Sequence, residues 1–60
     1  MKYEVTLRDA GVLEIDASSF DVRDGALVFF HSQGLGKAGV ARRIIRSFAP
    51  GVWLEIKEIS

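Results

Sequence analysis

The sequence contains no cysteine and only one histidine among its 60 residues. The absence of cysteine excludes disulfides, thiolate metal sites and thiol catalysis, and it fits a reducing, cytoplasmic setting. With a single histidine, we expect no zinc site, since zinc requires three or four protein ligands of matched type. A chain of this length buries only about 60% of the surface that its unfolded form exposes, so we expect oligomerisation to reinforce the fold.

Long apolar runs are also lacking. No stretch approaches the ~18 apolar residues that cross a bilayer, and the N-terminal segment alternates polar with apolar residues instead of forming the apolar run of a signal peptide. We therefore expect a soluble cytoplasmic protein with no membrane partner.

Charge is balanced overall but not along the chain. The formal net charge is zero, yet residues 1–30 hold three basic and six acidic residues, whereas residues 31–60 hold five basic and two acidic residues. Residues 31–51 contain no acid at all. Such asymmetry steers an acidic partner or makes copies of the chain attract one another head to tail. Alternatively, the two halves neutralise each other within one fold.

Alternation of apolar and polar residues predicts strands in the first half of the chain. Two such segments, with apolar residues at Tyr3, Val5 and Leu7 and at Leu13, Ile15 and Ala17, are joined by a turn that ends at Gly11 and should pair antiparallel. Phe20 and Val22 predict a brief third strand, or a bend, that places both side chains in the core. Asp24-Gly25 is then typical of a primed hairpin turn.

The strand expected at Ala26–His31 is apolar on both faces, so its second face requires a cover, either a loop of the chain or another molecule. Residues 32–41 predict a flexible glycine-rich loop. A phosphate-binding P-loop is excluded because His31 stands at its first glycine position and Ala38 replaces the hydroxyl residue that holds magnesium.

The segment Val40–Phe48 fits two templates. Its apolar residues share one arc of a helix, but its β-branched residues favour a strand. We expect a strand, with a helix at about residues 38–48 as the alternative. Pro50 and Gly51 suit the two central positions of a type II turn, which predicts a closing β-hairpin. In its last strand, Val52, Leu54 and Ile56 should face the core and Trp53 the solvent.

These patterns predict one all-β domain over residues 1–60, a small antiparallel barrel or rolled sheet of five or six strands. The alternative is an α+β fold containing the helix. The segments DGALVF (residues 24–29) and FAPGVW (residues 48–53) resemble those of small proteins of unknown function from actinobacteria and their phages. That resemblance implies a phage or prophage origin but no activity. The order of strands also looks like that of small SH3-like or Sm-like barrels, which does not license a function.

No set of residues predicts catalysis. The serines lie in no recognisable nucleophile context beside His31, and the carboxylates are scattered without calcium-loop spacing. We expect a non-enzyme with no catalytic residue, no metal, no cofactor and no small-molecule substrate.

Two groups of residues predict binding instead. The first is a basic patch of Lys37, Arg42, Arg43 and Arg46. It could contact nucleic-acid phosphates, or it could pair with the acidic half of the sequence, within one chain or between chains. The second consists of apolar residues left over from the core, namely Trp53, Phe30, Val28, Val12, Ile59 and Leu35. Aromatic residues with arginine around them dominate protein interfaces. We therefore expect a small binding or assembly protein that contacts a second copy or another protein through a surface containing Trp53 and Phe30, with nucleic-acid binding as the alternative.

Overall fold

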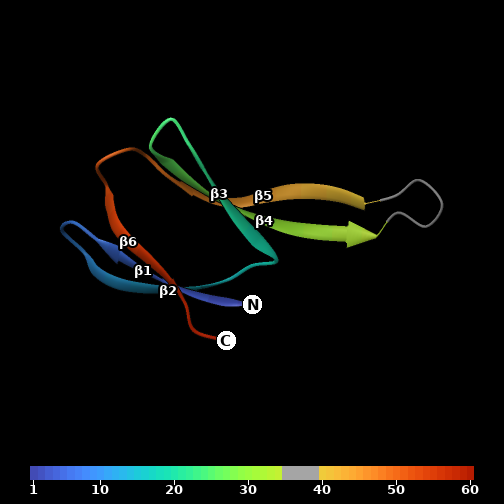
Figure 1. Ribbon diagram of the computed structural model, residues 1–60, viewed down its shortest axis with the longest axis horizontal. Helices are drawn as coiled ribbons and strands as arrows, with labels where there is room; N and C mark the ends of the chain where they lie inside the picture. Colours follow the sequence, from blue (N-terminus) through green and yellow to red (C-terminus); the bar gives the residue numbers. More distant parts are fainter. Residues whose placement is uncertain (35–39) are drawn as a thin grey trace.

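The computed structural model describes residues 1–34 and 40–60, which form six β-strands in antiparallel pairs (Figure 1). The strands are β1 (Lys2–Leu7), β2 (Gly11–Asp16), β3 (Ser19–Arg23), β4 (Ala26–Gly34), β5 (Val40–Phe48) and β6 (Trp53–Glu58). The all-β prediction is confirmed. The helical alternative is wrong over residues 40–48, because this segment pairs with β4 as a strand. In the part of the chain that the structure describes, no helix is long and apolar enough to cross a membrane.

The strands divide between two sheets of three strands each. Sheet A has the order β2-β1-β6, and sheet B has the order β3-β4-β5. No strand pairing joins the two sheets within residues 1–34 and 40–60, so these residues form no closed barrel. The central strands, β1 and β4, supply most of the side chains buried between the sheets.

The core forms where the inner faces of the two sheets meet. Its buried members are Tyr3, Val5, Ile15, Ala17, Leu27, Phe29 and Phe48. Phe29 lies at the centre, since its ring centroid is 5.6 Å from that of Tyr3 and 6.3 Å from that of Phe48. The alternation predicted for β1 and β2 is confirmed. Phe20 contacts Tyr3 edge to face at 5.3 Å but stays partly exposed at the margin of the core.

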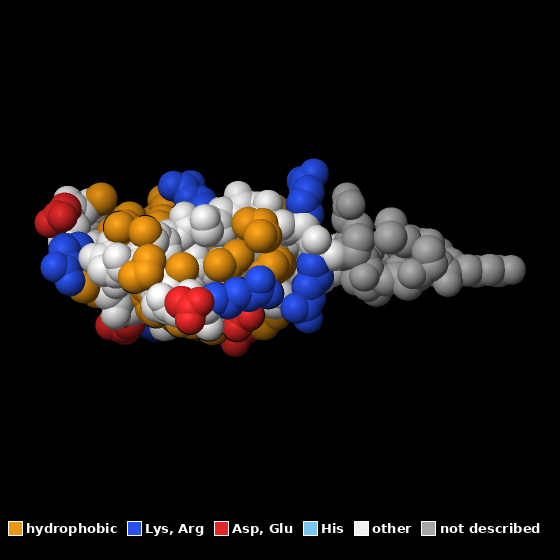
Figure 2. All heavy atoms as spheres, turned by 90° about the horizontal axis from the view of Figure 1, so that it is seen from above, with side chains coloured by type: hydrophobic (Ala, Val, Ile, Leu, Met, Phe, Trp, Pro, Cys, Tyr) orange, Lys and Arg blue, Asp and Glu red, His pale blue; other side chains and the backbone are white. Residues whose placement is uncertain are grey.

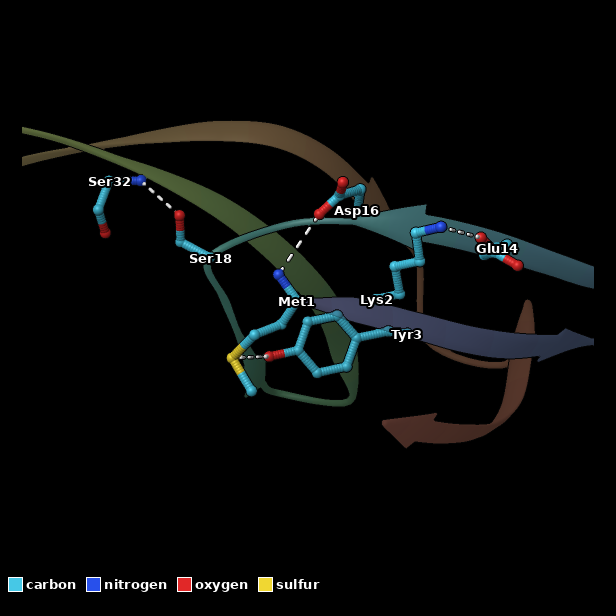
Figure 3. Close-up of polar contacts among 7 residues, drawn as sticks. All are labelled: Met1, Lys2, Tyr3, Glu14, Asp16, Ser18 and Ser32. Carbon is cyan, nitrogen blue, oxygen red and sulfur yellow. Dashed lines mark hydrogen bonds and ion pairs between the residues drawn. The ribbon is translucent and has the colours of Figure 1, made fainter. Parts of the chain in front are cut away.

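The chain passes from sheet A to sheet B between Ala17 and Ser18, whose backbone amides bond to different sheets. The amide of Ala17 donates to the Met1 carbonyl, in sheet A, and the next amide, of Ser18, donates to the Phe30 carbonyl, in sheet B. The Ser18 hydroxyl then accepts a hydrogen bond from the amide of Ser32 at 3.1 Å (Figure 3). A side chain thus extends the β3–β4 ladder by one bond beyond its last backbone pair.

The turns explain why the sheets separate. Asp24 and Gly25 have φ of 50° and 83°, as the predicted primed hairpin turn requires, and they join β3 to β4. The predicted type II turn is also present, with Gly51 at φ 83° and the Val52 amide bonded to the Ala49 carbonyl. It closes no hairpin, however, because β5 pairs with β4 and β6 pairs with β1. A type II turn splays its flanking strands, so here it connects the two sheets.

Two β-bulges change which side chains face the core. In β5, Phe29 pairs with Arg46 and Phe30 pairs with Ile44, so Ile45 is the extra residue. In β6, the register with β1 passes from Glu55 to Trp53, so Leu54 is the extra residue. The predicted inward orientation of Leu54 and outward orientation of Trp53 are therefore wrong: Leu54 is 56% exposed, and Trp53 packs against the core.

Strand β4 is longer than predicted, because Ser32–Gly34 belong to it rather than to the loop expected at residues 32–41. Strand β5 has the predicted bounds, Val40–Phe48, so Val40 and Ala41 also belong to a strand. The pairing of β4 with β3 ends at Phe30, so beyond that residue β4 and β5 form a two-stranded arm (Figure 1). The predicted interface residue Leu35 and the predicted basic residue Lys37 lie outside the described residues.

Candidate interaction surface

Over residues 1–34 and 40–60 the structure contains no pocket and no group of three or more metal-ligating side chains. The only histidine, His31, is exposed and lies opposite Arg43 on the β4–β5 arm. The groups that could recognise a partner therefore lie on the exterior faces of the sheets and along their edge strands.

The outer face of sheet B has an apolar centre. Val28 and Phe30 are only 8% and 4% exposed, although both lie on the side of β4 opposite to the core residues Leu27 and Phe29. The sequence predicted that this second apolar face requires a cover. Over Phe30, two arginines of the chain itself contribute to this cover.

These arginines approach Phe30 from the two neighbouring strands. The guanidinium carbon of Arg23, on β3, lies 5.3 Å from the ring centroid, and that of Arg42, on β5, lies 5.7 Å away. Both distances fall within the range of cation–π attraction. Arg23 Nε also donates to Asp21 Oδ2 at 3.0 Å, and this hydrogen bond lowers the pKa of the Asp21 carboxyl. Phe30 is thus buried beneath charged groups rather than within the core.

Strand β5, the edge of sheet B, carries both charged and apolar groups. Ile44 and Ile45 are 58% and 37% exposed between arginines. Arg42, Arg43 and Arg46 form no ion pair with any carboxylate of the described residues, which include every acidic residue of the chain. The predicted pairing of these arginines with the acidic half of the same chain is therefore not formed at ion-pair distance, although the charge of Arg42, after the hydrogen bond from Arg23, helps to lower the pKa of the Asp21 carboxyl. We call Arg42, Arg43, Ile44, Ile45 and Arg46 the β5 surface.

The bulge at Ile45 decides how the predicted basic patch is arranged. Arg42 lies on the outer face of sheet B, opposite Ser32. Arg43 and Arg46, three positions apart, would point in opposite directions in a regular strand, but the extra residue places both on the core-facing side. There the Arg46 guanidinium lies 5.4 Å from the Phe48 ring centroid. The arginines thus line both sides of one edge strand.

The predicted interface residues do not share one surface. Trp53 is half-buried, and its Nε1 donates to the Gly25 carbonyl at 2.9 Å, so it contributes to the join between the two sheets. Phe30 lies on the outer face of sheet B, beneath arginines. Val12 is 59% exposed on the outer face of sheet A, and Ile59 is 38% exposed beside β1, bonded to the Lys2 carbonyl. The structure does not bring Trp53 and Phe30 together on one face.

The outer face of sheet A is acidic, which sequence reasoning did not predict. Cross-strand registers place four acidic residues on it, namely Glu4, Glu14, Asp16 and Glu55, together with two lysines, Lys2 and Lys57. Two of the acidic residues are in ion pairs: Lys2 Nζ lies 3.6 Å from Glu14 Oε1, and the Met1 amino group lies 3.4 Å from Asp16 Oδ1 (Figure 3). We call these four acidic residues the acidic face. Only the pairing of β1 with both β2 and β6 reveals it.

Figure 2 shows how these features appear from one side. Apolar side chains cross the middle of this face, and Lys and Arg side chains gather at the end where β4 and β5 extend.

No family model, no curated protein and no solved structure matches the chain. The resemblance to actinobacterial and phage proteins therefore stays a prediction, and function is argued from the surface itself.

Proposed function

We propose that this protein is a non-catalytic binding and assembly module that docks onto an acidic protein surface through its β5 surface. One observation carries the proposal: an edge strand presents three arginines that form no ion pair with the described residues, together with two exposed isoleucines. Arginine is enriched in protein interfaces and, with aromatic residues, supplies most of their binding energy.

The setting of Arg42 supports this proposal. Its guanidinium lies over the Phe30 ring, and Arg23 approaches the same ring from β3, the strand on the other side of β4. Contact with the ring restricts the conformations of a side chain that would otherwise lose much entropy on binding. An arginine held in place before the partner arrives binds more tightly than a freely moving one.

Nucleic acid is the second candidate partner, and one observation favours it. Beyond Phe30 the chain continues as a two-stranded arm that carries Arg42 and Arg43, and the major groove of DNA admits a two-stranded β-ribbon. However, nucleic-acid-binding domains carry a positive excess, whereas this chain is neutral with a pI near 6.5. The charge balance favours an acidic protein surface.

Fluorescence anisotropy with two labelled probes of equal length, poly-L-glutamate and single-stranded oligodeoxythymidylate, tests the proposal. We expect the protein to bind poly-L-glutamate, with an affinity that falls as salt rises. The double variant Arg43→Gln/Arg46→Gln should lose this binding. The matched variant Lys2→Gln/Lys57→Gln, which removes the same charge from sheet A, should keep it.

The two probes separate the candidates. Arginine-dependent binding that is tighter to the oligonucleotide would replace the proposal with nucleic-acid recognition. Binding to neither probe, or equal losses in both double variants, would overturn it.

A further inference from the structure

We infer that the acidic surface bound by the β5 surface is the acidic face of a second copy of this chain, so that copies associate head to tail. This inference rests on the proposed binding function and names its partner. It starts from the observation that one neutral molecule has three arginines on one edge strand and, in a different sheet, a face on which carboxylates outnumber basic groups.

The four carboxylates of the acidic face outnumber the basic groups beside them, which are Lys2, Lys57 and the Met1 amino group. Glu4 lies directly opposite Glu14 in the β1–β2 register, where like charges destabilise a sheet, and directly opposite Lys57 in the β1–β6 register. Glu4 and Glu55 form no ion pair with any of the described residues. Arginines from outside the molecule would relieve this repulsion.

The β5 surface has the complementary charge. Its three arginines lie on a strand without acidic residues, inside a stretch of the sequence, residues 31–51, that lacks acids altogether. A neutral molecule with its charges separated in this way attracts its own copies in one relative orientation and repels them in others.

Apolar groups are available on both surfaces. Exposed ion pairs are individually weak, so a stable contact also requires apolar burial. Val12 lies on the outer face of sheet A, where it pairs with Thr6, and Thr6 pairs on its other side with Glu55. Ile44 lies between Arg42 and Arg46 on the β5 surface. Each surface thus combines an exposed aliphatic side chain with an excess of charge of one sign.

The contact is made by side chains and not by strand addition. A bulge and charged side chains on an edge strand oppose pairing with a further strand, and β5 has a bulge at Ile45 and three arginines. Because the β5 surface and the acidic face are different patches, the contact is heterologous, and repeating it produces a ring or an open chain of copies.

Reversing the charges on each surface separately tests the inference by sedimentation velocity at low salt. The variants are Arg43→Glu/Arg46→Glu, which makes the β5 surface acidic, and Glu4→Arg/Glu14→Arg, which makes the acidic face basic. Each alone should sediment as a monomer while the unaltered protein associates. An equimolar mixture should associate again, because each surface of one variant, altered or unaltered, has a surface of opposite charge on the other variant.

Two further variants control for net charge and for folding. A chain that carries all four reversals keeps a net charge of zero and should associate as the unaltered protein does. Arg8→Glu, in the turn between β1 and β2, should leave association unchanged.

The outcomes distinguish this inference from the proposed function. Association of the unaltered protein without recovery in the mixture or in the four-reversal chain would overturn the head-to-tail contact but leave an assembly function. A monomer that still binds poly-L-glutamate would overturn the inference and leave acidic-surface binding. A monomer that binds no probe would overturn both.

Discussion

Leu27 and Leu54 are the same residue type in very different environments. Leu27 is fully buried in the core, whereas Leu54 is the bulged residue of β6 and is 56% exposed. We expect Leu27→Ala to lower the free energy of unfolding by about 2–5 kcal/mol, because it removes buried methyl groups and leaves a cavity. Leu54→Ala should change it by no more than about 0.5 kcal/mol. Urea unfolding followed by Trp53 fluorescence measures both, and equal losses would contradict the bulge at Leu54.

Asp21 is the one carboxyl whose pKa is lowered by a defined contact, the hydrogen bond from Arg23. A folded-state pKa below the ordinary value of 3.8 means that this contact contributes stability above that pH and loses its contribution as pH falls through the lowered pKa. We expect Arg23→Ala to raise the pKa of Asp21 toward 3.8, and Arg46→Ala to leave it unchanged. NMR titration of the Asp21 carboxyl carbon measures this, and a value that Arg23→Ala does not move would contradict the contact.

Two turns form the corner where the sheets are joined. The β3–β4 turn lies against the β5–β6 turn so closely that a methyl group at Gly25 would be 3.2 Å from Pro50 Cβ. Trp53 Nε1 bonds the Gly25 carbonyl across the same corner. We expect Trp53→Phe to keep the packing but lose this hydrogen bond, which costs about 0.5–1.5 kcal/mol of unfolding free energy.

The same substitution separates an internal role for Trp53 from an interface role. If Trp53 joins the sheets, Trp53→Phe should leave the sedimentation coefficient unchanged while it lowers the urea midpoint. Altered association at unchanged stability would instead return Trp53 to the interface that the sequence predicted.

The positions of the strands could be predicted from the sequence. The side of the sheet on which each side chain lies could not always be predicted. Alternation located β1 and β2 and their core residues, and Asp24-Gly25 located the hairpin turn between β3 and β4. One extra residue inverts the alternation between the two parts of a strand that it separates. The bulge at Ile45 therefore places Arg43 and Arg46 on the same side of β5, and the bulge at Leu54 turns Trp53 toward the core. No local pattern marks a bulge, because its backbone is set by pairing with a distant strand.

The candidate surface depends even more on pairing. The sequence identified the arginines of β5, but their place on an edge strand follows from a turn that separates β5 from β6 instead of pairing them. Likewise, Glu4 and Glu55 are far apart in the sequence but lie on the same face of sheet A. Glu55 is directly opposite Thr6 in the β1–β6 register, and Glu4 is two residues from Thr6 on β1. Long-range strand pairing creates both charged surfaces.

At the scale of the whole molecule, the fold leaves much apolar surface in water. The exposed large apolar residues of the described chain are Met1, Val12, Phe20, Val22, Ile44, Ile45, Val52, Leu54 and Ile59. A domain of 60 residues has an unfolding free energy of only about 3–9 kcal/mol. Association that covers part of this surface would therefore contribute a large share of the total stability.

This coupling predicts that stability depends on protein concentration. If only folded copies associate, mass action stabilises the folded state as concentration rises, so the urea midpoint should increase between micromolar and millimolar protein at low salt. At about 0.5 M NaCl the increase should shrink, because screening weakens exposed ion pairs. Arg43→Glu/Arg46→Glu should abolish the increase at any salt concentration, whereas Arg8→Glu should keep it. A midpoint independent of concentration at low salt would mean that folding and association are not coupled, and that the 60-residue chain is stable as a monomer.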